Sequence, residues 1–107
     1  MQLDISGHHI EVTEALKTHV REKFEKIEQH FDTITDIHCV LTVEGDRHIA
    51  EASIAVPGKR LFAVEETEDM YKSVDKLAHV LNRRVRRHKE RVCNHHVREA
   101  QYINGHF

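Results

Sequence analysis

The residues with the clearest chemistry in this chain form one short basic run at positions 83–91. The run holds six Lys or Arg residues and one acid in nine positions, although the 107-residue chain has a net charge of −2. Guanidinium and ammonium groups make charge-assisted hydrogen bonds with phosphate oxygens. The run therefore favours binding to a polyanion, and nucleic acid is the polyanion that this charge density indicates.

The charge is unevenly distributed along the chain. Residues 83–98 carry seven bases and one acid, or +6, whereas residues 1–82 carry nine bases and sixteen acids, or −7. The alternative to a polyanionic partner is a solvated helix end whose cations interact with the helix dipole. That interaction is worth about 0.3–1 kcal/mol and acts only in the last turn, and like charges four residues apart, such as Arg83 and Arg87, cost about 0.2–0.5 kcal/mol. We therefore favour nucleic acid over a solvated face.

Other residue clusters lack a catalytic or metal-binding pattern. The residues that suggest zinc do not have the paired spacing of common zinc sites; they are His88, Cys93, His95 and His96. Asp75, Glu66 and His79 resemble an acid–base set, but no pocket is implied for them. No glycine-rich phosphate loop, nucleophile elbow or H-E-x-x-H motif occurs in the sequence. We predict a protein that is not an enzyme and that has no metal site and no cofactor.

Length and composition indicate one small domain. A chain of this length supports a single core. Its two cysteines are too few for a disulfide scaffold, its N-terminus has no signal-peptide pattern, and no apolar run is long enough to span a membrane. We expect a cytoplasmic, monomeric protein without membrane association.

Hydrophobic periodicity predicts the first half of the fold. Residues 1–6 alternate as a short strand, and Gly7 ends it. Thr13 is the predicted N-cap of a helix of about five turns. Its apolar stripe has helical spacing, and consists of Leu16, Val20, Phe24, Ile27 and Phe31. Residues 35–44 and 47–56 then alternate as two strands, joined by a turn at Gly45.

The second half contains another strand and the basic helix. A turn at Pro57 and Gly58 precedes a strand over residues 59–66, for which we predict Phe62 and Val64 on one face, with Phe62 in the core. Either Thr67 or Asp69 caps the long helix that follows, and its pattern continues to about Val92. The predicted buried stripe consists of Met70, Val74, Leu77, Ala78, Leu81 and Val85, with Tyr71 at the edge of the core.

The element order β-α-β-β-β-α predicts a two-layer α/β (α+β) sandwich. The β-α-β start favours a parallel pair of strands, and the short turns favour antiparallel pairing afterwards. One apolar face on the sheet and one apolar stripe on each helix then place both helices on the same side of a four-stranded mixed sheet. We predict a folded domain over residues 1–92 and a flexible C-terminal tail over residues 93–107.

The predicted cations lie away from the core. At 100° per residue, Lys72, Lys76, Arg83 and Arg87 lie opposite the apolar stripe of the second helix. A helix over residues 69–92 is about 36 Å long and an eight-residue strand covers about 27 Å, so we expect the last turns of the helix to overhang the sheet. On the first helix, His19, Lys23, Lys26 and His30 form one line along a flank; whether it faces the other helix is left open. The predicted RNA-binding residues are Lys23, Lys26, Lys72, Lys76, Arg83, Arg84, Arg86, Arg87, Lys89 and Arg91.

Several of these residues also resemble a known family. Asp69-Met70-Tyr71, followed by Val74-Asp75-Lys76-Leu77 and by the basic positions through Arg91, is similar to the hibernation-promoting factor family of bacterial ribosome-associated proteins. Residues 1–7 and 11–16 match the same family, and the likeness covers about residues 1–92. The length resembles that of its short members, which lack a C-terminal dimerisation domain.

The resemblance implies a fold related to double-stranded RNA-binding domains and a site in the mRNA and tRNA channel of the small ribosomal subunit. Short members promote inactive ribosome dimers in stationary phase together with a separate modulation factor, whereas a close relative blocks translation without dimerisation. The family's basic helix positions correspond to Arg83, Arg87, Lys89 and Arg91. Val80 departs from the family, in which Lys is common there, and Lys76 or Arg84 is the candidate for compensation. The tail from Cys93 onward is a second departure.

The sequence thus predicts a ribosome hibernation factor that binds rRNA of the small subunit, inhibits translation and promotes inactive dimers, with no DNA specificity. The alternative is a protein-interaction module whose basic helix docks an acidic protein.

Overall fold

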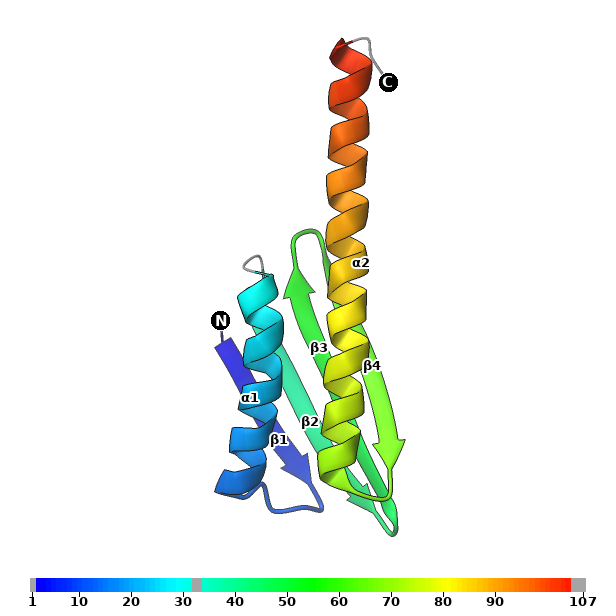
Figure 1. The fold of residues 1–107 in the computed structure, drawn as a ribbon. Helices are drawn as coiled ribbons and strands as arrows, with labels where there is room; N and C mark the ends of the chain where they lie inside the picture. The colour runs from blue at the N-terminus through cyan, green and yellow to red at the C-terminus, as the bar shows by residue number, and fades with distance from the viewer. Residues whose placement is uncertain (1, 32–33, 105–107) are drawn as a thin grey trace.

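Figure 1 shows the computed structural model, which describes residues 2–31 and 34–104; the side chains of 30 and 90–104 are outside the description. Within residues 2–31 and 34–104, two helices and four strands follow one another in the predicted order. They are β1 (Gln2–His8), α1 (Glu14–His30), β2 (Asp36–Glu44), β3 (Arg47–Val56), β4 (Lys59–Thr67) and α2 (Met70–Asn104).

The four strands form one mixed sheet in the order β1-β2-β3-β4. β1 and β2 are parallel, with Gln2 opposite Asp36, and the pairs β2–β3 and β3–β4 are antiparallel. Both helices lie side by side on one face of the sheet (Figure 1). The predicted two-layer α/β sandwich is therefore confirmed, and neither of the described helices lies on the opposite face of the sheet.

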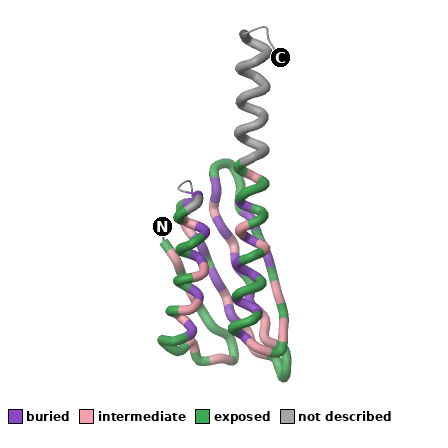
Figure 2. The backbone as a smooth tube through the Cα atoms, viewed as in Figure 1, coloured by how far each residue is buried: buried purple, intermediate pink, exposed green. Residues whose placement is uncertain are grey.

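The core lies between the helices and the inner sheet face (Figure 2). All five predicted apolar positions of α1 and all six of α2 are buried. On the sheet, burial alternates with period two, as pleated strands require; the buried strand residues are Ile37, Cys39, Leu41, Ala50, Ala52, Ile54, Val56, Leu61 and Ala63. The two periodicities recognised in the sequence thus meet in a single core.

Side-chain caps begin both helices. Thr13 is the N-cap of α1, and its Oγ1 accepts a hydrogen bond from the backbone N of Leu16 at 3.2 Å. For α2, Asp69 has the capping role: its Oδ1 accepts from the backbone N of Tyr71 at 3.1 Å. Thr67 acts one step earlier, because its Oγ1 accepts from the N of Asp69 at 3.1 Å. The choice between Thr67 and Asp69 is thereby resolved.

One buried polar side chain connects α2 to the sheet. Ser73 is 0% exposed. Its Oγ donates to the carbonyl oxygen of His48 on β3 at 2.6 Å and lies 2.8 Å from Oγ1 of Thr67. Since a buried hydroxyl is tolerated only when it is hydrogen-bonded, these contacts fix the first turns of α2 over β3.

The prediction for β4 was wrong about its inner face. Leu61 and Ala63 are buried, whereas Phe62 and Val64 are 61% and 58% exposed on the opposite face. Apolar residues occupy both faces in this strand, so alternation alone did not decide which pair lies inside. The register decides it, because Leu61 pairs with buried Ile54. Tyr71, predicted at the core edge, is 40% exposed.

The prediction for the end of α2 also differs from the structure. The sequence pattern indicated an end near Val92, whereas the backbone of α2 is helical to Asn104 and extends past the β3–β4 turn (Figure 1). Residues 93–103 contain no Gly or Pro to stop a helix, and Gly105 follows the observed end. The boundary between a domain at 1–92 and a flexible tail at 93–107 stays a prediction.

Candidate nucleic-acid interface

Most of the predicted basic residues lie on the outer side of α2. Its exposed arginines are Arg83, Arg84, Arg86 and Arg87. Among the side chains that the structure describes, no carboxylate makes an ion pair with any of them. Within the described part of the chain, their positive charge is therefore directed to solvent and is not neutralised by a carboxylate.

A shallow depression lies on the side of α2 that faces β4. Val80, Arg83, Arg84 and Arg87 line it, at helical spacing of three and four residues, and its volume is about 210 Å³. Nη1 of Arg84 donates a hydrogen bond to the carbonyl oxygen of Phe62, which holds this guanidinium against β4. Val80 packs partly against the core. It is the apolar residue among the three arginines that line this depression.

A second, larger groove separates the two helices. It measures about 340 Å³, and α1 contributes Lys23, Lys26 and Ile27, whereas α2 contributes Asp75, Ala78, His79 and Asn82. The basic flank of α1 thus faces α2, which the sequence had left open. The side chain of His30, at the end of the predicted line, is outside the description. Two grooves with cationic walls therefore border the exposed arginines of α2.

Asp75 of α2 reaches across the groove between the helices and contacts two residues of α1. Its Oδ1 lies 2.7 Å from Nε2 of His19 and 3.6 Å from Nζ of Lys23. The ring of His19 in turn packs edge-on against Tyr71, with centroids 5.0 Å apart. These contacts align the helices, and they leave Lys26 as the groove lysine without an ion pair among the described residues.

The remaining predicted residues lie at the two ends of the described part of α2. Nζ of Lys72 lies 3.0 Å from Oε1 of Glu68, and the hydrogen bond and charge of Glu68 raise the pKa of Lys72. Lys76 is exposed one turn further along. Nζ of Lys89 lies 5.4 Å from the ring centroid of Phe31, over the end of α1. The side chain of Arg91 is outside the description.

The structure separates Glu66 from Asp75 and His79, the other two members of the set that resembled an acid–base arrangement. Asp75 contacts His19 between the helices, whereas Glu66 accepts a hydrogen bond from Arg47 at 2.7 Å on the open sheet face. That contact with Arg47 lowers the pKa of Glu66. Within the described residues, no group of three or more His, Cys, Asp or Glu side chains is placed to hold a metal ion.

Sequence reasoning missed two members of the groove, His79 and Asn82. Together with Asp75 they follow one flank of α2 at i, i+4 and i+7, a spacing that places them on one side of a helix. The polar character of that flank was visible in the sequence. Its position toward α1 depends on how the helices pack.

Comparison with known proteins agrees with this geometry. A family model described as Sigma 54 modulation protein / S30EA ribosomal protein matches residues 3–93. The ribosome hibernation promoting factor of Pseudomonas putida is 43% identical over 91 residues, which cover 85% of this chain and 89% of that protein. The factor of the same name from Salmonella typhimurium is 43% identical over 95 residues, or 89% of this chain and all (100%) of that protein.

Solved structures show the same fold. A ribosomal subunit interface protein from Coxiella burnetii has a TM-score of 0.80 at 29% identity, covering 84% of this chain and 99% of that one. The N-terminal domain of Thermus thermophilus Protein Y has a TM-score of 0.76 at 26% identity, covering 81% and 98%. None of the described helices has the length and apolar character needed to cross a membrane.

The sheet with two helices on one face is thus the domain found in ribosomal subunit interface proteins. The chain belongs to the Sigma 54 modulation protein / S30EA ribosomal protein family, and the resemblance to hibernation-promoting factors is confirmed.

Proposed function

We propose that this protein is a ribosome hibernation factor that binds rRNA of the small subunit in the mRNA and tRNA channel. Bound there, it inhibits translation and promotes inactive ribosome dimers in stationary phase. Relatives at 43% identity carry the name ribosome hibernation promoting factor. The observation that carries the proposal is the exposed set of α2 arginines, which have no carboxylate partner among the described side chains.

The binding mechanism is electrostatic and depends on shape. Arg83, Arg84, Arg86 and Arg87 contact backbone phosphates along α2, and Lys89 and Arg91 extend this contact toward the end of the helix. Phosphate contacts position a protein without reading base sequence. Specificity therefore comes from the fit of two cationic grooves, on either side of α2, to a folded RNA surface.

Lysines extend the surface on both sides. Lys23 and Lys26 approach the same RNA from the wall of the groove between the helices, and Lys72 and Lys76 continue it toward the start of α2. Lys72 contributes less than the arginines, because Glu68 already neutralises it. Arg84 lies next to Val80 in the depression on α2 and supplies a cation there.

A salt titration tests the proposal. If about six to eight phosphates are contacted, affinity for purified small subunits falls by about 10³-fold or more between 50 and 200 mM KCl, because each contact releases a condensed counterion. Affinity that does not change across this range contradicts electrostatic binding to rRNA. Treatment with RNase before co-sedimentation separates rRNA binding from the alternative, an acidic protein partner, since only the first is lost.

The effect on ribosomes is tested by sedimentation. Sucrose gradients of ribosomes with the protein, with and without a separate modulation factor, show whether dimers form. A dimer peak that needs the protein supports the dimer-promoting role. Inhibited translation with no dimer peak under either condition assigns the protein to the blocking role alone.

A further inference from the structure

The face of the sheet opposite the helices has a distinct chemistry. The strand register places its side chains in rows across the sheet, one of which runs from Ser6 through Val40 and Glu51 to Val64. The neighbouring row runs through His38 and Ser53 to Phe62. No described helix covers this face (Figure 1).

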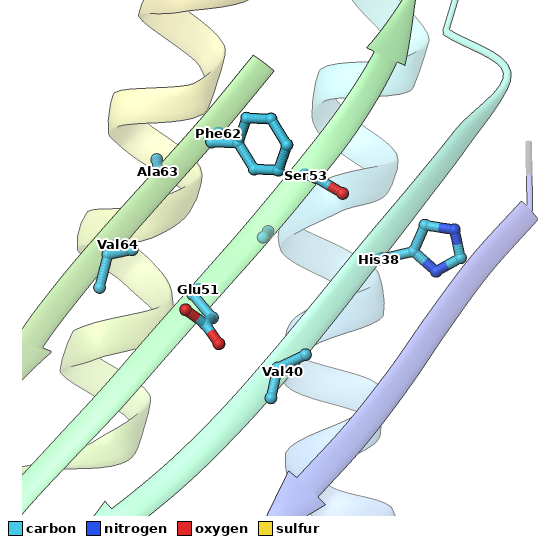
Figure 3. Close-up of a pocket in the computed structure, with 8 residues that line it drawn as sticks. His38, Val40, Glu51, Ser53, Phe62, Ala63 and Val64 are labelled. Atoms are coloured by element: carbon cyan, nitrogen blue, oxygen red, sulfur yellow. The ribbon is translucent and has the colours of Figure 1, made fainter. Parts of the chain in front are cut away.

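An apolar depression lies at the centre of this face, toward β4. Its volume is about 250 Å³, and it is lined by His38, Val40, Glu51, Ala52, Ser53, Phe62, Ala63 and Val64 (Figure 3). Phe62 and Val64 are 61% and 58% exposed and are among the largest exposed apolar side chains of the described residues. Exposed apolar surface of this kind, with polar groups around it, is typical of an interaction site.

The charge of this face is opposite to that of α2. Its carboxylates outnumber its guanidinium groups: Asp4, Asp36, Glu44, Glu51 and Glu66 against Arg47 and Arg60. Both arginines are already paired, Arg47 with Glu44 and Glu66, and Arg60 with Asp36.

Glu51 differs from the other carboxylates of this face. Among the described residues it has no ion pair or side-chain hydrogen bond, although Asp4, for example, lies 3.2 Å from His38. Figure 3 shows its carboxylate between Val40 and Val64, and it shows Phe62 in the neighbouring row, next to Ser53. Glu51 is exposed and lines the apolar depression. A negative charge in such a place is complemented by a cation on an aliphatic stem.

We propose that this depression binds a Lys or Arg side chain from a cationic protein segment of the ribosome. The methylene stem packs on Val40 and Val64, the charged head meets the carboxylate of Glu51, and the ring of Phe62 adds a cation–π contact. This inference rests on the proposed function, since it assumes that the basic face of α2 is held on rRNA.

RNA does not fit this face as an occupant. Phosphates are repelled by its unpaired carboxylate and by its excess of acids. The observations therefore favour a basic protein segment lying on the face of the sheet.

Photo-crosslinking on purified small subunits tests the proposal. The photoreactive residue p-benzoyl-phenylalanine is placed at position 62 in one variant and at position 83 in another. We expect position 62 to crosslink to a Lys- or Arg-rich protein segment, identified by mass spectrometry, and position 83 to crosslink to rRNA. Two results overturn this inference and leave the proposed function standing. One is crosslinking of position 62 to rRNA, and the other is the absence of any crosslink from position 62 while position 83 still crosslinks to rRNA. Failure of the unmodified protein to bind subunits overturns the proposed function as well.

A charge substitution provides a second readout. Glu51→Gln is expected to lower affinity for small subunits about 10-fold, because a charge-assisted contact is lost, and to leave affinity for protein-free rRNA unchanged. Asp46→Asn, in the exposed β2–β3 turn, removes the same charge outside the depression and serves as the matched control. Equal effects of the two substitutions, or an equal loss on protein-free rRNA, overturn the inference.

Discussion

Asp75 on α2 contacts His19 on α1, with 2.7 Å between Oδ1 and Nε2. The same oxygen lies 3.6 Å from Nζ of Lys23, so one carboxylate offsets part of the positive charge in the groove between the helices. An incoming phosphate competes with Asp75 for Lys23. Asp75 therefore links the packing of the two helices to the affinity of the proposed RNA surface.

Removing this carboxylate is expected to strengthen binding. Asp75→Asn is predicted to raise affinity for small subunits about 2–5-fold, because Lys23 becomes available to phosphate. The contact is partly exposed, so the free energy of unfolding changes by less than about 1 kcal/mol. Glu14→Gln breaks the comparable Lys17–Glu14 pair and is the control in binding assays at fixed salt. Weaker binding by Asp75→Asn contradicts the prediction.

Reversing charge on the outer side of α2 is expected to abolish binding without unfolding the protein. Arg83→Glu with Arg87→Glu is predicted to reduce subunit affinity at least 100-fold, because two phosphate contacts become repulsive. Both side chains are exposed and have no ion pair among the described residues, so the thermal midpoint changes little.

The control for this variant is Arg21→Glu with Lys59→Glu, which makes the same change in net charge at exposed positions outside both grooves. It is expected to retain most of the binding. A large drop in the thermal midpoint of the Arg83 and Arg87 variant, measured by differential scanning calorimetry, shows instead that these residues serve the fold.

Neighbouring residues of β4 are expected to differ in their effect on stability. Leu61→Ala is predicted to lower the free energy of unfolding by about 2–4 kcal/mol, because it leaves a cavity in the core. Phe62→Ala removes a larger side chain, but one that is 61% exposed, and is predicted to cost less than about 1 kcal/mol. Urea unfolding of both variants measures the difference, and the reverse order contradicts the observed faces of β4.

The buried thiol of Cys39 predicts a stability change at alkaline pH. Burial, and secondarily the charge of Glu51, raise the pKa of Cys39 from its ordinary value of 9.0 to about 12. The folded thiol stays protonated while the unfolded one ionises, so its contribution is fully present below pH 9 and is lost as pH rises toward 12. Wild-type protein is expected to lose up to about 1.4 kcal/mol per pH unit in this window.

Cys39→Ala isolates this effect, because it removes the titrating thiol and keeps every other group. Unfolding free energies are compared between pH 8 and 11 in a Cys93→Ser background, so that a single cysteine is present. Parallel pH curves for the two proteins contradict the prediction.

Periodicity was sufficient for most of the fold because each element presents one apolar face. Val20 and Phe24 on α1, and Val74 and Leu81 on α2, follow the helical repeat, and all are buried. The β4 strand was the exception, since Leu61 and Phe62 are both apolar and only pairing with β3 selects between them. The alternation therefore did not predict Phe62 on the surface, and it did not predict the depression that Phe62 and Glu51 line.

The amino-acid sequence by itself determined the order of the elements, the side of each helix that packs inward and the separation of acid from base along the chain. These properties depend on the spacing of residues along the chain. The pleat of a strand and the pitch of a helix place residues of a given spacing on one face. Only the tertiary structure decided that Lys23 faces α2 and that Asp75 reaches His19. It also decided that Glu51, which has no ion pair among the described residues, lines the same depression as Phe62. Contacts of this kind join residues far apart in the chain, and they depend on strand register and helix packing, which no local repeat specifies.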